Sequence, residues 1–162
     1  VRLGLDSDAA VTAAFDEILQ NARAFNKNAR IEGVLVQEMV KGGIETILGV
    51  TNDPLFGPAV MFGIGGVFAE VLKDVSFRMA PVTPAVAREM IDEIKGSAVL
   101  KGARGAAPAD LDALADVIVR VSAMAIDLQD RMAELDINPL FVFPQARGVK
   151  AGDALIRPKP AA

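Results

Sequence analysis

Apolar residues recur at intervals of three and four along three segments of the chain, the spacing of a helix with one buried side. The first segment predicts a helix over residues 8–26, and Ser7 is among the polar residues that can cap it. The second predicts a helix that has Thr83 as its cap and Pro84 as its first residue and that ends at Gly96. The third predicts a longer helix that Pro108 opens and that packs on a sheet. The three stripes are Val11, Phe15, Ile18, Ala22 and Phe25; Ala87, Met90, Ile91 and Ile94; and Leu111, Leu114, Ile118, Val121, Ala125 and Leu128.

Shorter runs with alternating or continuous apolar residues predict strands between these helices. We expect strands over residues 33–39 and 45–50, joined as a hairpin through Gly42 and Gly43. Further strands are expected over residues 59–62, 68–78, 132–138 and 149–156. The strands come in runs and do not alternate strictly with helices, so the predicted fold class is α+β, a mainly antiparallel sheet with packed helices.

Two of these strands carry a polar face. In the strand over residues 68–78, Glu70, Asp74 and Arg78 fall on one side, while Val75 and Phe77 fall on the other.

In the last polar strand, alternation places Glu134, Asp136 and Asn138 on one face and Leu135 and Ile137 on the other. Hard cations such as Mg²⁺ take carboxylate and carbonyl oxygens and keep phosphate oxygens as further ligands, which favours a metal and nucleotide site. A strand with a solvated face that ends at Pro139 explains the same pattern.

The composition excludes several classes of function. The 162 residues suffice for one ordinary domain and include no histidine and no cysteine, which excludes a Ser-His-Asp triad and a histidine-ligated zinc. A net charge of −4 and the lack of Tyr and Trp argue against nucleic-acid binding. No apolar run reaches the roughly 18 to 20 residues of a membrane span, and no signal-like segment is present, so we expect a cytoplasmic protein that does not enter a membrane.

The two ends of the chain suggest a piece of a larger protein. The first residue is Val1 and not Met, and the Pro- and Ala-rich residues 157–162 are expected to form a disordered tail. Residues 1–156 are therefore expected to form the folded domain.

Several short motifs occur in an order that resembles one enzyme family. They are Gln37-Glu38-Met39-Val40, Gly43-Ile44-Glu45, Asp53-Pro54-Leu55-Phe56-Gly57-Pro58, Gly63-Ile64-Gly65-Gly66, the segment from Asp74 to Arg78, Gly102-Ala103-Arg104-Gly105 and Glu134-Leu135-Asp136-Ile137-Asn138-Pro139-Leu140. Together they resemble the ATP-grasp region of NDP-forming acyl-CoA synthetases, above all the ADP-forming acetyl-CoA synthetases and, more distantly, succinyl-CoA synthetase. The resemblance implies the C-terminal lobe of an ATP-grasp fold. Taken alone, the glycine-rich Gly63-Ile64-Gly65-Gly66 is more simply explained as a connection between strands.

The resemblance implies a nucleotide-binding role for two neighbouring segments. The residues Gln37, Glu38, Met39 and Val40 match the hinge that contacts adenine, largely through backbone groups. Glu45 is similar to the acidic residue that holds the ribose hydroxyls, and a carboxylate can accept both. An exposed strand carboxylate without such a role is the alternative for Glu45.

The resemblance also implies a magnesium site. Asn138 looks like the family's Mg²⁺ ligand, with Asp136 beside it on the same strand face, and Asp153 resembles the second metal carboxylate on the following strand. Adjacent antiparallel strands lie about 5 Å apart, so Asn138 and Asp153 can share one ion if the register allows it. Leu155 stands where the family often has arginine, which leaves a charged contact from that position in doubt.

Arg78 and Arg104 are candidates for binding phosphate, because a guanidinium group matches phosphate oxygens and keeps its charge at neutral pH. Ion pairing with Asp74 or another carboxylate is the alternative for both arginines, and a purely structural role is the alternative for Glu70 and Asp74.

These expectations combine into a functional hypothesis with ATP and Mg²⁺ as cofactors. The parent protein would form acyl-CoA from a carboxylic acid, CoA and ATP through acyl phosphate and phosphohistidine intermediates, with the histidine in a segment outside this chain. Its partners would be the missing N-terminal ATP-grasp lobe and the CoA-binding domains. A regulatory, nucleotide-sensing domain of a fusion protein such as an acetyltransferase is the alternative, and a purely structural subunit is a third.

Overall fold

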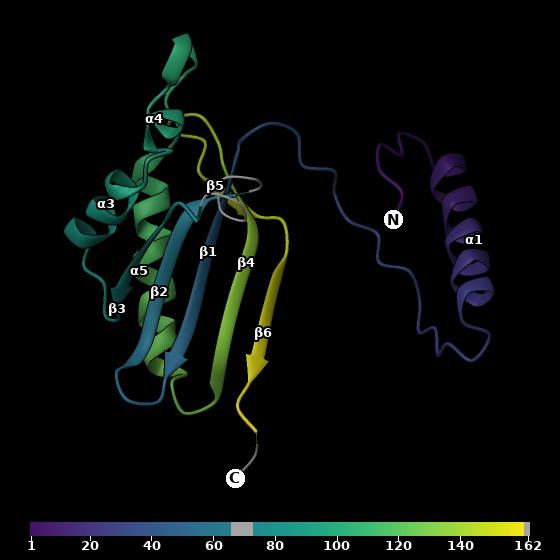
Figure 1. The fold of residues 1–162 in the computed structure, drawn as a ribbon. Helices are drawn as coiled ribbons and strands as arrows, with labels where there is room; N and C mark the ends of the chain where they lie inside the picture. Colours follow the sequence, from purple (N-terminus) through teal and green to yellow (C-terminus); the bar gives the residue numbers. More distant parts are fainter. Residues whose placement is uncertain (66–72, 161–162) are drawn as a thin grey trace. The chain divides into compact units, whose positions relative to one another are not determined.

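The computed structural model describes residues 1–65 and 73–160, which divide into two compact units (Figure 1). The first unit is Val1–Lys41 and the second is Gly42–Ala162. A single domain over residues 1–156 was expected, so the division after Lys41 is a finding of the structure. It comes one residue after the predicted hinge segment, which ends at Val40.

The first unit contains α1 (Asp8–Phe25), which confirms the predicted helix. The predicted burial of its apolar stripe is wrong, because Phe15 and Phe25 are exposed and the buried residue of this helix is Ala14. Ser7 caps this helix, because its hydroxyl accepts a hydrogen bond from the Ala10 N–H at 3.3 Å. Residues 33–39 form no strand, so the predicted hairpin with residues 45–50 is wrong. The strand that contains residues 45–50 pairs with two other strands, one at each edge, and no edge remains for residues 33–39.

The second unit is built on a six-stranded sheet in which every pairing is antiparallel. Its strands are β1 (Ile44–Asp53), β2 (Gly57–Ile64), β3 (Val75–Met79), β4 (Met132–Val142), β5 (Val149–Ala151) and β6 (Ala154–Pro158). The order is β3-β2-β1-β4-β5, and β6 also pairs with β4 (Figure 1). The α+β class with an antiparallel sheet is confirmed.

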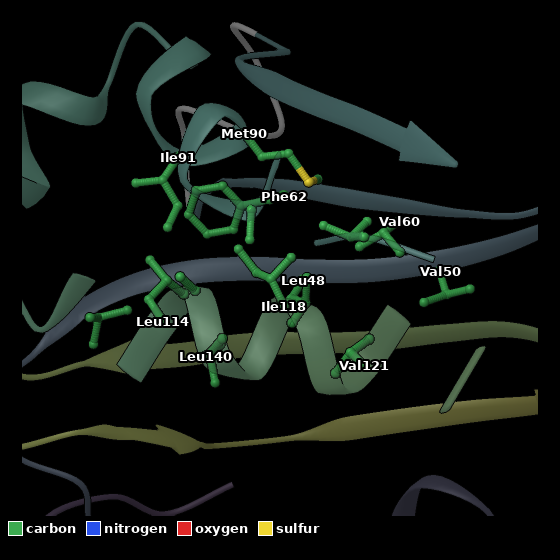
Figure 2. Packing of buried hydrophobic residues seen from close by; sticks show 14 of the residues in the cluster. Leu48, Val50, Val60, Phe62, Met90, Ile91, Leu114, Ile118, Val121 and Leu140 are labelled. Carbon is green, nitrogen blue, oxygen red and sulfur yellow. The ribbon is translucent and has the colours of Figure 1, made fainter. Parts of the chain in front are cut away.

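Helices pack on one face of this sheet. They are α3 (Pro84–Glu93), α4 (Ser97–Leu100) and α5 (Leu111–Asp127), with a 3₁₀ turn, η1 (Ala103–Gly105), between α4 and α5. Figure 2 shows Leu48 and Phe62 from the strands packed with Met90 from α3 and with Leu114 and Ile118 from α5. All five are fully buried, which confirms that the predicted stripes of α3 and α5 face the core.

The ends of these helices differ in detail from the predictions. Thr83 caps α3 as expected, but α3 ends at Glu93, before Gly96. At Gly96 a Cβ atom would lie 2.7 Å from Ile64 Cγ1, so this glycine permits close packing. The α5 helix begins at Leu111, three residues after Pro108, because the Asp110 carboxylate accepts from the Ala113 N–H at 3.1 Å and acts as the cap.

The polar face of the strand around Arg78 points toward the helices. Val60 pairs with Arg78 and Phe62 with Ser76, and both apolar partners are buried. The Ser76 hydroxyl donates to the Met90 carbonyl at 2.9 Å. The strand begins only at Val75, and residues 68–72 of the prediction lie outside the described residues.

The C-terminal segment also differs from its prediction. The expected strand over residues 149–156 is two strands, β5 and β6, with Gly152 and Asp153 between them. The expected tail begins inside β6, because Arg157 and Pro158 pair with Glu134 and Met132. The Lys159 N–H then donates to the Arg131 carbonyl at 2.7 Å.

Candidate functional site

The sheet face opposite the helices, here called the open face, collects most of the predicted metal and ribose residues. Leu48 and Val50 of β1 are buried against the helices, so the alternate residues Glu45, Gly49 and Thr51 project to the open face. The register of β1 with β4 places Glu134 opposite Thr51 and Asp136 opposite Gly49. Directly opposite residues of an antiparallel pair share a face, so both carboxylates lie on the open face.

Asn138 and Asp153 meet across β4 and β6. Ile137 pairs with Ala154, and the Asn138 N–H donates to the Asp153 carbonyl at 3.2 Å, which places the two residues opposite each other. Both side chains are exposed, as is that of Asp136, which lies two residues before Asn138 on the same strand. One carboxylate oxygen of Asp153 accepts from the Ala154 N–H at 2.8 Å, which leaves its other oxygen for a further contact.

The donor set of this pair fits a magnesium ion. An amide oxygen from Asn138 and a carboxylate oxygen from Asp153 are the hard ligands that Mg²⁺ prefers. Across the described part of the chain, no group of three or more His, Cys, Asp or Glu side chains is placed to hold a metal ion. Mg²⁺ usually takes one or two protein ligands and completes its octahedron with water and phosphate oxygens, so a pair of donors suffices.

Glu45 lies on the same face near the end of β2. Its side chain is exposed, and it pairs with Phe141 of β4. Its carbonyl accepts from the Gly65 N–H at 2.9 Å, and a Cβ atom on Gly65 would approach that carbonyl to 3.2 Å. The glycine-rich segment therefore passes directly beside Glu45.

Gly63, in the same segment, has a structural explanation. A Cβ atom there would lie 2.8 Å from both the Asp74 carbonyl and Val75 Cγ1, so only glycine lets β2 and β3 approach. This agrees with the simpler interpretation of that motif as a strand connection.

The predicted hinge residues belong to the first unit. Gln37, Glu38 and Met39 line a cavity of about 730 Å³, together with residues of α1 and of the N-terminal segment. Val40 follows them in the same unit. Glu45 and the metal candidates belong to the second unit.

Arg78, one of the two predicted arginines, is not placed on the open face. Arg78 points to the helix side, where its guanidinium donates to Glu93 of α3 at 2.7 Å and to the Phe77 carbonyl at 2.8 Å. This contact agrees with the alternative of ion pairing, with Glu93 in place of the expected Asp74. The backbone of Arg104 lies in η1, and its side chain lies outside the described part of the structure.

Asp74 makes structural contacts, in agreement with the alternative given for it above. Its buried carboxylate accepts from the Lys95 N–H at 2.8 Å and from the Gly96 N–H at 2.7 Å. It thereby fixes the segment that follows α3 to the start of β3. Glu70 lies outside the described residues.

One ion pair on the open face was not expected from the sequence. Arg157 of β6 pairs with Glu134 of β4, its direct neighbour across the two strands. The alternation of Asp153, Leu155 and Arg157 could have indicated that the three side chains share a face. It was missed because residue 157 was assigned to a disordered tail.

Comparison with known proteins identifies the fold. The ATP-grasp domain family matches residues 1–157. The chain belongs to the ATP-grasp family. Of the helices that the structure describes, none combines the length and the hydropathy that a membrane span requires.

Relatives of this ATP-grasp chain are ADP-forming acid–CoA ligases. The beta subunit of acetate–CoA ligase (ADP-forming) II from Pyrococcus furiosus is 47% identical over 156 residues, which are 96% of this chain and 66% of that subunit. The 4-hydroxybutyrate–CoA ligase (ADP-forming) of Nitrosopumilus maritimus is 45% identical over 156 residues, and the chain spans 22% of it.

A solved structure of the same kind has the same fold. It is the dinucleotide-forming acetyl-coenzyme A synthetase 1 of Candidatus Korarchaeum cryptofilum in complex with coenzyme A and Mg-AMPPCP, with its phosphohistidine segment pointing towards the nucleotide-binding site. The TM-score is 0.85 at 39% sequence identity, and the match covers 98% of this ATP-grasp chain and 67% of the other.

Proposed function

We propose that this chain supplies nucleotide- and magnesium-binding residues to an ADP-forming acyl-CoA synthetase. The observation that carries the proposal is the position of Asn138 opposite Asp153 on the open face, with Asp136 and Glu45 on the same face. Relatives that form acyl-CoA with ADP as product, and a relative solved with Mg-AMPPCP, support the same assignment.

The residues of the open face have complementary roles in this proposal. Asn138 and Asp153 hold the ion through oxygen atoms, and Asp136 lies close enough along β4 to act as a further ligand or to orient water. When bound, Mg²⁺ offsets the negative charge of the phosphates while the phosphoryl group is transferred. Glu45 accepts hydrogen bonds from the ribose hydroxyls.

The proposal also includes the remaining predicted contacts. The segment Gln37, Glu38, Met39 and Val40 contacts adenine, and Arg104 contacts phosphate. Arg78 would have to leave Glu93 to do the same, which makes it the weaker of the two arginine candidates.

The complete reaction needs segments beyond this chain. A phosphohistidine intermediate requires a histidine, and none of the 162 residues is one. The solved relative carries a phosphohistidine segment that points towards its nucleotide site, so we assign this step to another part of the parent protein. The other partners in the proposal are the rest of the ATP-grasp fold and the domains that bind CoA and the carboxylic acid, in a cytoplasmic enzyme.

The test uses the full-length protein that contains this chain. ATP, Mg²⁺, CoA and a panel of short carboxylic acids are supplied, and we expect ADP formation that depends on CoA and on one of the acids. Asn138→Ala and Asp153→Ala should each raise the Mg²⁺ concentration for half-maximal rate by roughly 10-fold or more, as expected when a metal contact is lost. Asp130→Asn, an exposed residue in the turn before β4, is the matched control and should leave it unchanged.

Two outcomes would change the assignment. Nucleotide binding that requires Asn138 and Asp153, without any CoA-dependent ADP formation, would favour the regulatory, nucleotide-sensing alternative. No nucleotide effect of either substitution would favour a structural subunit. A histidine-bearing loop or an acetyltransferase domain in the parent sequence separates the enzyme from the regulatory fusion.

A further inference from the structure

The metal-binding half of the open face is rich in negative charge. Glu134, Asp136 and Asp153 all lie on it, and a nucleotide triphosphate adds more negative charge at the same place. One bound Mg²⁺ offsets only part of this charge, so a positive side chain on the same face is needed to bind the phosphates well.

Arg157 meets this requirement. Resting on the proposed function, we propose that Arg157 binds the phosphate groups of the nucleotide, and that Glu134 holds its guanidinium group on the open face until the nucleotide arrives.

The position of Arg157 follows from the register of β6. Leu155 pairs with Asp136 and Arg157 with Glu134, so the side chains of Asp153, Leu155 and Arg157 project to one face. At about 3.3 Å per residue, Arg157 lies about 13 Å along the strand from Asp153. The long arginine side chain and a triphosphate held at the metal can together bridge that separation.

The backbone at Arg157 is fixed on both sides. Pro158 pairs with Met132, and the Lys159 N–H donates to the Arg131 carbonyl at 2.7 Å. The backbone of Arg157 is therefore already ordered before the nucleotide binds, which reduces the loss of conformational entropy on phosphate binding.

The ion pair with Glu134 is easy to exchange. The side chains of Arg157 and Glu134 are 64% and 49% exposed, and ion pairs between exposed groups contribute little to stability. A guanidinium group makes two-pronged hydrogen bonds with phosphate as it does with a carboxylate, and the triphosphate carries more negative charge, so Arg157 gains when it turns from Glu134 to the nucleotide.

Leu155 does not offer such a contact. It lies on the open face between Asp153 and Arg157, is 68% exposed and carries no charge. Among the open-face side chains of β6, Arg157 alone can bind an anion. Leu155 also provides a site at which an arginine can be reintroduced as a test.

Calorimetric titration of the full-length protein with ATP in the presence of Mg²⁺ tests the proposal. Arg157→Ala should raise the Kd for ATP about 10-fold or more, as expected for the loss of charge-assisted hydrogen bonds. The Kd for adenosine, measured by competition, should not change because adenosine has no phosphate. Arg120→Ala, an exposed arginine of α5 paired with Asp116, is the matched control and should bind ATP as the wild type does.

A second set of variants tests the contact by rescue. In the Arg157→Ala background, Leu155→Arg should recover ATP binding and Leu155→Ala should not. Equal affinities of the two double variants would contradict a phosphate contact from this strand. Thermal unfolding midpoints equal to the wild type verify that the variants are folded.

Glu134→Gln tests the second half of the proposal. This change keeps an oxygen that can accept from Arg157 but removes a negative charge near the phosphates, so ATP should bind at least as tightly. Weaker binding would contradict the role assigned to Glu134.

Failure of this inference can be told from failure of the proposed function. If Asn138→Ala weakens Mg-dependent ATP binding and Arg157→Ala does not, Arg157 is no phosphate ligand and the magnesium site remains. If neither change has an effect, both proposals are wrong.

Discussion

The two faces of the sheet are built from the same strands but differ in burial. On the helix side, Leu48 and Phe62 are fully buried, and their neighbours pack against α3 and α5 (Figure 2). On the open face, Asp136, Asn138 and Asp153 are exposed. The comparison teaches that alternation along β1 and β4 separates the residues that pack the core from the polar residues on which the proposed function rests.

The largest expected effect is on stability, and two phenylalanines on neighbouring strands measure it. Phe62 is fully buried on the helix side, whereas Phe77 lies on the open face and is 51% exposed. Phe62→Ala should lower the free energy of unfolding by about 3–5 kcal/mol, because it removes buried surface and leaves a cavity. Phe77→Ala should cost about 1 kcal/mol or less.

Urea denaturation monitored by circular dichroism provides both values, with the slope of the transition as a check that the unfolded states are comparable. Similar losses for the two variants would mean that the open face is also packed against something in the intact protein.

A smaller effect concerns the pH dependence of the free energy of unfolding, through Asp110 at the start of α5. Backbone N–H groups of Gly148 and Ala113 donate to the Asp110 carboxylate and hold its pKa below the usual value of 3.8. A lowered pKa in the folded state means that the stabilisation is present above the unfolded pKa and is lost as pH falls through the folded pKa. Wild type should therefore lose stability relative to Asp110→Asn as the pH falls below about 4.

Unfolding free energies measured from pH 7 to pH 2 provide the test. Asp130→Asn is the control, and a pH profile of Asp110→Asn that runs parallel to the wild type would contradict the assignment.

The smallest effect on stability is expected on the open face. Asp136→Asn should change the free energy of unfolding by no more than about 0.5 kcal/mol, because the side chain is exposed. The same change should raise the Mg²⁺ concentration that nucleotide binding requires in the full-length protein, measured by Mg²⁺ titration at fixed ATP. A large loss of stability with unchanged Mg²⁺ dependence would reverse the assignment of this residue.

Local patterns predicted much of the fold from the sequence. The helix α1, the buried stripes of α3 and α5, and the cap at Thr83 follow from spacing and cap chemistry alone. The alternation in residues 134–138 also placed Asp136 and Asn138 on one face correctly. These features depend on neighbours within a few residues, which the sequence contains.

Features that depend on distant partners were missed. Residues 33–39 have the pattern of a strand, but a strand forms only with a partner, and both edges of β1 are occupied. The polar side of β3 left two roles open for Arg78, and the sequence did not indicate that the partners of Arg78 and Ser76 lie on α3. Arg157 was hidden because Pro158 suggested a tail, although an edge position in a sheet tolerates proline.

The backbone bond from the Asn138 N–H to the Asp153 carbonyl has an evolutionary consequence. It ties the two donors to the hydrogen-bond ladder, so the loop between β4 and β5 can lengthen or shorten without moving them apart. Deleting Gly152, the residue before Asp153, would act differently. With β5 held in place, β6 would slip by one position, Ala154 and Ile156 would take the places of Asp153 and Leu155 on the open face, and the proposed ion-binding pair would be lost while the fold survived.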